Sequence, residues 1–311
     1  MVKITEKDIA NYERDGVVKI KGAMTASQIE ELDRSITPYL ARRKLKNKLM
    51  FGDSHFFTRP NVWKTDPYFL QLVQQPMFIN LAARLLKSNR INLLMDMLFV
   101  KSASCKKEFG WHQEHSYTPT QGDMLISFWM ATENVSLDDG GLQFIKGSHR
   151  WTEKFRLPPK LIPVSKFLPQ YWGKSKTEDF SGRTCEESDL YSKDDVVSFD
   201  VEPGDILAFP GNTLHRSGPN WADNIDRKGY VIRYTGDDVT YRPHSDTGIS
   251  FQLWDAELNM GEKMRGPLYP LVYKNGKCLE LESVGLEKGR FWRLVQKQIL
   301  SLRGKSAGRK K

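Results

Sequence analysis

Residues 203–215 carry the sequence PGDILAFPGNTLH, in which a short apolar segment lies between two turn signals. The apolar segment Ile206–Phe209 has the length of a strand, and the Pro, Gly, Asn and Asp residues on either side favour tight turns. Similar apolar runs occupy residues 91–101, 125–132, 141–145 and 230–234. Many short strands separated by turns, without long alternating helices, predict an antiparallel barrel or jelly roll.

The N-terminal part of the chain, about residues 1–90, is predicted to be mainly helical. Thr5–Asp8 and Thr25–Gln28 both have the spacing of a capping box, in which a hydroxyl is followed three residues later by a carboxylate or amide. Pro67 and Pro76 each stand where the first turn of a further helix would begin. We therefore expect helices to precede the β core and to pack on one side of it.

One domain is predicted over residues 1–302, because a β domain of more than 200 residues often forms a single unit. Its expected parts are the helical segment 1–90, a β core over about 91–240 with an insertion at 151–201, and a C-terminal extension over 241–302. The last nine residues, 303–311, include five basic residues and no large apolar one. This tail is predicted to be disordered.

Charge and composition narrow the class of protein. The net charge is +9, from 47 basic and 38 acidic residues. The basic cluster at residues 42–48 indicates either a solvated helix end or an anionic substrate or partner. Aromatic residues are not interleaved with the basic ones along a recognisable motif, so a nucleic-acid partner is not expected.

Three scattered cysteines and the hydropathy of the chain bear on its location. Cys105, Cys185 and Cys278 lack the close spacing of a zinc or redox pair, which fits a reducing compartment. No apolar run of about 18 residues is present, and none follows Met1, so neither a membrane span nor a secretory signal is expected. These features together predict a cytoplasmic protein.

The most chemically informative residues are histidines. His112 and Glu114 stand two apart, so on a strand their side chains would project from the same face. His215, directly after the strand and turn quoted above, is the best candidate for a third ligand. Two histidines and one carboxylate on one side of a metal suit Fe(II) and leave coordination positions for a co-substrate and O₂. A His-x-Glu pair by itself is common in salt bridges, so the surrounding motifs decide.

Those motifs resemble the phytanoyl-CoA dioxygenase family of Fe(II)/2-oxoglutarate oxygenases across nearly the whole chain. Residues 111–114 (WHQE) are similar to the family's Trp-His-Gln-Asp iron motif, and 215–220 (HRSGPN) to its distal His-Gly-Ser-Gly-Pro-Asn. The other matching segments are residues 12–18, 139–142, 146–150, 203–205, 227–228 and 233–238. The resemblance implies a mainly β fold, a double-stranded β-helix or jelly roll with the N-terminal helices on one side.

The resemblance also implies roles for individual residues. His112, Glu114 and His215 match the iron ligands. Arg227 matches the arginine that binds the distal carboxylate of 2-oxoglutarate, and Ser217 matches the hydroxyl beside it. Two further positions match residues that border the co-substrate, Trp129 and Gln113. The cofactors implied are Fe(II), 2-oxoglutarate and O₂, with ascorbate as a reductant in vitro.

The sequence departs from the family pattern in two places. The family usually has Asp where this chain has Glu114, a longer carboxylate that would shift the metal or bend the side chain. The interval from His215 to Arg227 is one residue longer than usual, which leaves Lys228 and Arg233 as alternatives for the co-substrate anchor. Arg233 is otherwise expected to be a paired charge on the outer face of the barrel.

The implied reaction couples decarboxylation of 2-oxoglutarate to succinate and CO₂ with oxidation, usually hydroxylation, of an unactivated C–H bond. The substrate would be a small organic or lipid-like molecule, possibly anionic, selected by the N-terminal helices and the insertion 151–201. Two other functions remain open: a catalytically silent jelly-roll binding protein, and a cupin-like metal enzyme independent of 2-oxoglutarate that would not need Arg227.

Overall fold

A computed structural model describes residues 4–41, 55–156, 182–186, 195–243 and 258–281. The predicted disordered tail, the basic cluster at 42–48, and most of the insertion 151–201 and of the extension 241–302 lie outside these residues. The division of the chain into one domain with these parts stays a prediction. No helix in the described ranges is long and apolar enough to cross a membrane.

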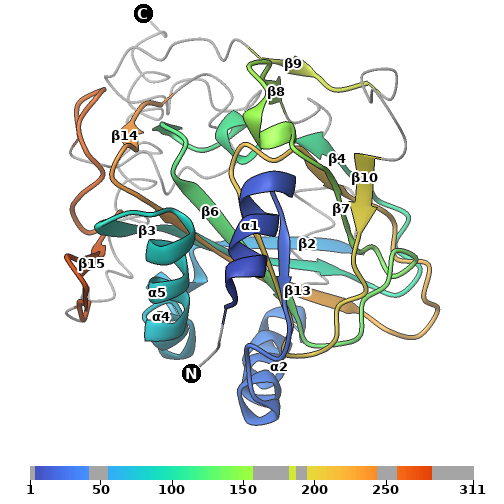
Figure 1. Cartoon of the computed structure of the whole chain (residues 1–311). Coiled ribbons are helices and arrows are strands. Elements are labelled where there is room, and N and C mark those ends of the chain that lie inside the picture. Colours follow the sequence, from blue (N-terminus) through green and yellow to red (C-terminus); the bar gives the residue numbers. More distant parts are fainter. Residues whose placement is uncertain (1–3, 42–54, 157–181, 187–194, 244–257, 282–311) are drawn as a thin grey trace, which may run out of the picture.

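Two antiparallel sheets form the core (Figure 1). Across the major sheet the strands follow the order β1 (Val18–Ile20), β11 (Ile206–Pro210), β6 (Leu125–Ala131), β13 (Arg227–Thr235), β3 (Arg90–Lys101), β15 (Leu271–Lys274) and β16 (Lys277–Cys278), and β2 (Phe56–Pro60) also pairs with β3. Across the minor sheet the order is β10 (Val196–Ser198), β7 (Leu142–Ile145), β12 (His215–Ser217) and β4 (Phe109–His112). Two short pairs complete the described strands: β5 (Thr120–Gln121) with β14 (Thr240–Tyr241), and β8 (Phe155–Arg156) with β9 (Arg183–Thr184).

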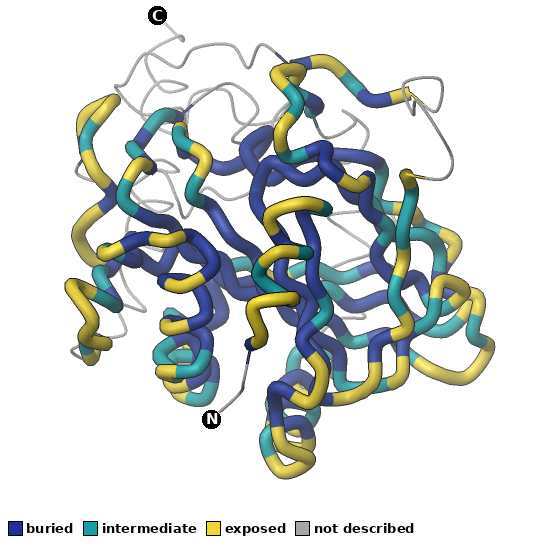
Figure 2. Tube along the Cα trace, viewed as in Figure 1, coloured by how far each residue is buried: buried dark blue, intermediate teal, exposed yellow. Residues whose placement is uncertain are grey.

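The central strands of the major sheet, β3, β6, β11 and β13, are buried on both faces, and Figure 2 draws them mostly in dark blue. On β13, Val231 packs in a cluster between the sheets, whereas Tyr230 and Ile232 pack with the helices on the opposite face. Successive side chains of a strand point to opposite faces, so this strand divides its residues between two cores. Such strands have near-continuous apolar sequences, which explains why residues 125–131 lack a polar alternation.

Helices cover the outer face of the major sheet, as expected. They are α1 (Glu6–Asp15), α2 (Ala26–Ala41), α4 (Pro67–Leu72) and α5 (Pro76–Leu85). Thr5 and Asp8 form the predicted capping box of α1, and Thr25 and Gln28 bond reciprocally at the start of α2. Pro67 and Pro76 begin α4 and α5 as predicted. Three one-turn 3-10 helices lie elsewhere: η1 (Val62–Lys64), η2 (Glu114–Ser116) and η3 (Ser148–Arg150).

The predicted fold class is confirmed: the chain is a jelly roll with N-terminal helices on one side. Several strands fall in segments for which the sequence indicated none, among them β2, β8, β9, β10, β15 and β16. β2 interrupts the helical N-terminal part, and β10, near the end of the insertion, completes the edge of the minor sheet by pairing with β7.

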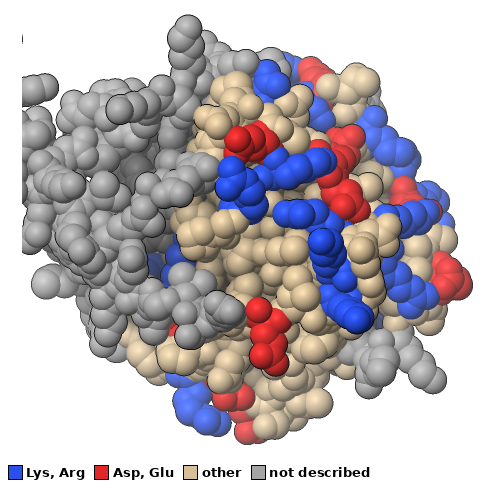
Figure 3. Space-filling view, turned by 90° about the vertical axis from the view of Figure 1, so that its left-hand side faces the viewer, with Lys and Arg blue, Asp and Glu red and all other residues tan. Residues whose placement is uncertain are grey.

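Figure 3 shows one side of the molecule, where lysine and arginine side chains lie among aspartate and glutamate side chains.

Candidate metal and co-substrate site

Two histidines face each other across the minor sheet. His112 ends β4 and His215 begins β12, and the two residues are direct partners in the antiparallel register. Their ring centroids lie 4.2 Å apart, and both side chains are buried. Residues that are far apart in the sequence are thus brought together by strand pairing.

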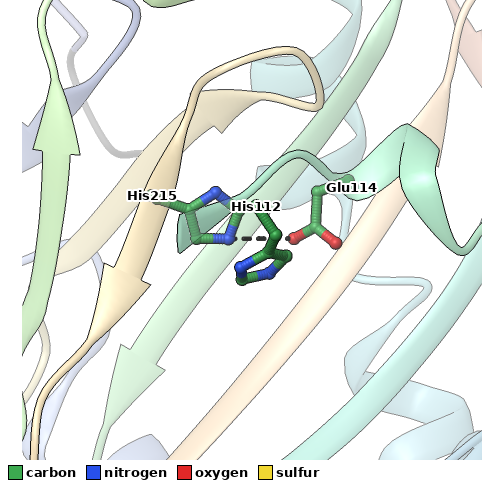
Figure 4. Close-up of side chains that lie close together, drawn as sticks. All are labelled: His112, Glu114 and His215. Carbon is green, nitrogen blue, oxygen red and sulfur yellow. Dashed lines mark ion pairs between the residues drawn. The ribbon is translucent and has the colours of Figure 1, made fainter. Parts of the chain in front are cut away.

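Glu114 lies beside the two histidines, but it is not on a strand as predicted. The strand β4 stops at His112, and Glu114 is the first residue of η2. Gln113 between them is extended, with φ −112° and ψ 147°, so one strand-like residue suffices to bring both side chains together (Figure 4). The backbone N–H of Glu114 donates to the carbonyl of Gly211 at 2.8 Å, which anchors this turn to the Pro-Gly-Asn turn after β11.

Each imidazole has one nitrogen engaged with the backbone. Nδ1 of His112 lies 2.8 Å from the carbonyl oxygen of Gly110, and Nδ1 of His215 lies 2.9 Å from that of Thr213. Because a carbonyl oxygen only accepts, Nδ1 carries the proton in both rings and Nε2 has a free lone pair. Burial, followed for His112 by the proximity of His215, lowers the pKa of both rings, which keeps them neutral.

The two oxygens of the Glu114 carboxylate have different surroundings. Oε1 accepts hydrogen bonds from Arg233 Nη2 at 2.8 Å and Ser127 Oγ at 3.2 Å, and lies 3.6 Å from His215 Nε2 (dashed line in Figure 4). Oε2 is buried and has no hydrogen-bond partner among the described residues. Since a buried carboxylate oxygen rarely stays unsatisfied, Oε2 is available to a ligand.

These side chains suit a divalent metal ion. One ligand atom from each of His112, Glu114 and His215 lies within 4.8 Å of the other two. Metal-binding histidines are usually neutral imidazoles whose second ring nitrogen donates its N–H to a backbone carbonyl or a carboxylate. Two histidines and a carboxylate on one side of an ion match the ligand set of non-haem Fe(II) oxygenases.

The three residues line a hollow between the sheets. Its walls are mainly apolar and aromatic, and they also include three arginines but a single acidic residue, Glu114. The wall contains Trp129, Arg216, Ser217, Arg227 and Arg233.

The structure places Arg227, Ser217 and Trp129 in this hollow. Arg227 is buried at the start of β13, its guanidinium lies over the Trp129 ring with 5.8 Å to the centroid, and its Nε has no hydrogen-bond partner among the described residues. Burial lowers the pKa of Arg227 to about 10, so the group remains charged at neutral pH. A buried charged fork with an unused donor is suited to a carboxylate.

Lys101, which was not among the predicted site residues, lies close to this arginine. Its Nζ donates to Ser217 Oγ at 2.8 Å, to the Ser217 carbonyl at 3.1 Å and to the Gly218 carbonyl. Burial, and then the charge of Arg227, lower the pKa of Lys101 well below its ordinary value. No feature of the sequence marked this lysine as buried, because a lysine at the end of a strand is usually exposed.

Gly229 makes room for Arg227 and Trp129. A Cβ at this position would lie 3.0 Å from Trp129 Nε1, 3.2 Å from the Phe99 carbonyl oxygen and 3.3 Å from Arg227 Nη1. These separations are tighter than ordinary van der Waals contact, so a larger residue would displace one of the two side chains.

Gln113 is positioned differently from the other predicted residues. Its amide nitrogen donates to the Asn212 carbonyl at 2.8 Å, and its amide oxygen accepts from the Phe155 backbone at 3.0 Å. It does not line the hollow, although it stands between His112 and Glu114 in the chain. A role beside the co-substrate stays a prediction.

The register of β13 separates the three candidate cations. Lys228 points to the helix-covered face, where it pairs with Glu133 at 2.7 Å and with Asp33. Arg227 and Arg233 are six residues apart on the inner face. The expectation that Arg233 lies on the outer face of the barrel is therefore wrong: it is buried and bonded to Glu114.

The family model for phytanoyl-CoA dioxygenase (PhyH) matches residues 12–229. The chain belongs to the phytanoyl-CoA dioxygenase family. It is therefore an oxygenase of the non-haem, 2-oxoglutarate-dependent class, as the motifs predicted.

Comparisons with individual relatives agree with this assignment. A phytanoyl-CoA dioxygenase domain-containing protein 1 homolog from Dictyostelium discoideum is 21% identical over 277 residues, covering 75% of this chain and 92% of that protein. The dioxygenase hkm4 from Aspergillus hancockii is 23% identical over 302 residues, covering 89% and 88%. The epimerase SnoN, solved with Fe³⁺, alpha ketoglutarate and nogalamycin RO, shares the fold with a TM-score of 0.62 at 20% identity, over 86% of this chain and 97% of that one.

Proposed function

We propose that this protein binds Fe(II) through His112, Glu114 and His215 and uses 2-oxoglutarate and O₂ to oxidise, most simply to hydroxylate, a C–H bond of a small organic or lipid-like molecule. One observation carries the proposal. Two neutral imidazoles and a carboxylate with an unpartnered oxygen converge within 4.8 Å in a hollow that also contains the buried Arg227. A metal site and a carboxylate site thus share one hollow.

When bound, Fe(II) with 2-oxoglutarate and O₂ supplies the oxidant, and the co-substrate leaves as succinate and CO₂. The protein's own residues bind and orient the reactants and exclude water. The backbone carbonyls of Gly110 and Thr213 fix the two imidazoles with Nε2 directed to the metal position. The apolar walls, which include Phe99, Phe209 and Val231, limit the access of water.

Arg227 is proposed to bind the distal carboxylate of 2-oxoglutarate. Its planar guanidinium can donate two parallel hydrogen bonds to a carboxylate, which a lysine cannot. Ser217 supports the same role, because its hydroxyl already accepts from Lys101 and can donate to the co-substrate. Trp129 packs against the guanidinium and restricts its orientation.

An anionic substrate is favoured by the charges around the hollow. Among the described residues, Arg216, Arg227 and Arg233 line it, and Glu114 is the one acidic residue in its wall. With a divalent metal bound, the positive charge exceeds what Glu114 and one dicarboxylate neutralise. A further acidic group on the substrate would reduce that excess.

The direct test is succinate release from 2-oxoglutarate on addition of Fe(II), O₂ and ascorbate, with and without a metabolite extract. We expect the parent protein to release succinate and to form a product 16 mass units heavier than its substrate, as the insertion of one oxygen atom requires. His112→Ala and His215→Ala should abolish Fe(II) binding while circular dichroism shows a folded protein. His149→Ala is the matched control, because this histidine contacts the Glu13 carbonyl away from the metal-ligand residues.

Other outcomes would identify the alternative functions. Fe(II) binding without succinate release under any condition would favour a catalytically silent binding protein. Substrate oxidation that does not require 2-oxoglutarate would favour a cupin-like enzyme. Unchanged Fe(II) stoichiometry in His112→Ala or His215→Ala would refute the metal assignment.

A further inference from the structure

Glu114 is a longer ligand than the aspartate typical of its motif, and its extra methylene adds a rotatable bond. A flexible carboxylate loses conformational entropy when it binds a metal. A ligand held in place beforehand avoids part of that loss. The surroundings of Glu114 show how this chain holds it.

Oε1 is held by two donors that come from neighbouring strands of the major sheet. Arg233 on β13 and Ser127 on β6 are direct partners in the antiparallel register. Both point into the space between the sheets and donate to the same oxygen, at 2.8 Å and 3.2 Å. The carboxylate itself comes from the opposite side, where Glu114 follows β4 of the minor sheet.

Arg233 is in turn fixed by Tyr117. Its Nη2 donates to the Tyr117 hydroxyl at 2.9 Å, and its guanidinium lies over the Tyr117 ring, 5.8 Å from the centroid. The arginine side chain is 3% exposed and that of Glu114 is 0% exposed, so solvent does not screen the ion pair. Tyr117 follows η2, which begins with Glu114. The residue that fixes Arg233 and the carboxylate that Arg233 binds therefore belong to one short segment.

We propose that Arg233 and Ser127 are positioning residues that, by donating to Oε1, hold the Glu114 carboxylate beside the two imidazoles, where it can bind the metal. This inference rests on the proposed metal site. Groups that orient a metal ligand through its second atom commonly change metal affinity by roughly ten- to a hundredfold when removed.

A different role for Arg233 predicts the opposite result. If the arginine only neutralised Glu114 in the metal-free protein, it would compete with the metal ion for the carboxylate. Its removal would then leave metal affinity unchanged or increase it. The sign of the change in metal affinity therefore distinguishes positioning from simple charge neutralisation.

The experiment measures the affinity of the full chain for Mn(II), and anaerobically for Fe(II), by titration calorimetry without co-substrate. Arg233→Met should weaken metal binding roughly ten- to a hundredfold. Arg233→Lys, which keeps one charged donor, should recover part of the loss. Arg90→Met is the matched control, because this arginine on the adjacent strand bonds Asn92 and the Met264 carbonyl instead.

Ser127→Ala gives a second, milder test that does not disturb a buried charge. Loss of this one hydrogen bond from a hydroxyl to a carboxylate, at about 1.5 kcal/mol, should weaken metal binding roughly tenfold. If Arg233→Met does not fold, the metal affinity of Ser127→Ala tests the positioning role by itself.

The outcomes are separable from failure of the proposed function. If His112→Ala loses the metal but Arg233→Met, or Ser127→Ala in its place, binds it as tightly as the parent or more tightly, the positioning role is refuted and the metal site stands. If His112→Ala also binds normally, the metal site itself is wrong.

Discussion

Replacement of Arg227 tests the co-substrate site most directly. The guanidinium is buried, is packed against Trp129 and retains an unpartnered Nε among the described residues. Each charge-assisted bond to a carboxylate contributes about 1.5–3 kcal/mol. Loss of one such bond corresponds to roughly a ten- to a hundredfold change, at about 1.4 kcal/mol per decade, and loss of a bidentate pair to more. Arg227→Met should therefore raise the 2-oxoglutarate concentration needed for half-maximal succinate release by at least roughly tenfold.

The neighbouring residue supplies the control. Lys228→Met removes a cation one position along the chain, but this lysine pairs with Asp33 and Glu133 on the helix-covered face. Its variant should keep the parent's requirement for 2-oxoglutarate, and both variants should bind Fe(II) normally. Arg227→Lys should recover only part of the loss, because an ammonium lacks the planar fork. A co-substrate defect in Lys228→Met, with none in Arg227→Met, would show that the interpretation of the β13 register is wrong.

Three further substitutions give independent checks. Gly229→Ala should weaken 2-oxoglutarate binding without changing metal affinity in calorimetry, because its Cβ would crowd Arg227 Nη1 and Trp129 Nε1; equal co-substrate affinity would contradict this. Glu114→Asp, which family resemblance alone predicts to retain activity, withdraws the carboxylate by about 1.5 Å and should bind Mn(II) more weakly than the parent but more tightly than Glu114→Ala. Burial raises the pKa of Asp96 to about 7, against about 3.9 in an unfolded chain, so the folded state holds the extra proton between these values and loses stability as pH rises. Asp96→Asn should remove this slope, at most about 1.4 kcal/mol per pH unit, from urea unfolding curves between pH 4 and 7; an unchanged slope would place the proton elsewhere.

The strands of the core were predictable because their apolar content is dictated by burial. Residues 125–131 and 206–210 are covered on both faces, so a continuous apolar run between turn residues was a reliable signal. β2 and β10 were not predicted, because their partly exposed residues show neither a continuous apolar run nor a clear alternation. These strands form through pairing with β3 and β7, which a reading of local sequence does not detect.

Residues of the candidate site that belong to a motif could be predicted from the sequence, whereas residues placed there by packing could not. His112, Glu114 and His215 were recognised from their motifs, and the structure brings them together. Lys101 and Arg233 were not assigned to the interior, because a charged residue in a strand is most often exposed. Their burial depends on partners from distant segments, Ser217 for the lysine and Glu114 for the arginine.

The two arginines of β13 connect these observations. Arg227 and Arg233 share one face of the strand, so a shift of its register by one residue would move both to the helix-covered side. Pairing with β6 and β3 along the whole strand opposes such a shift. On the helix-covered side, the Tyr230 hydroxyl donates to Asp96 at 2.7 Å and the Tyr234 hydroxyl to the Val73 carbonyl at 2.6 Å. Contacts with β3 and with the helical layer therefore both favour the register that places one arginine at the proposed co-substrate position and the other on the proposed metal ligand.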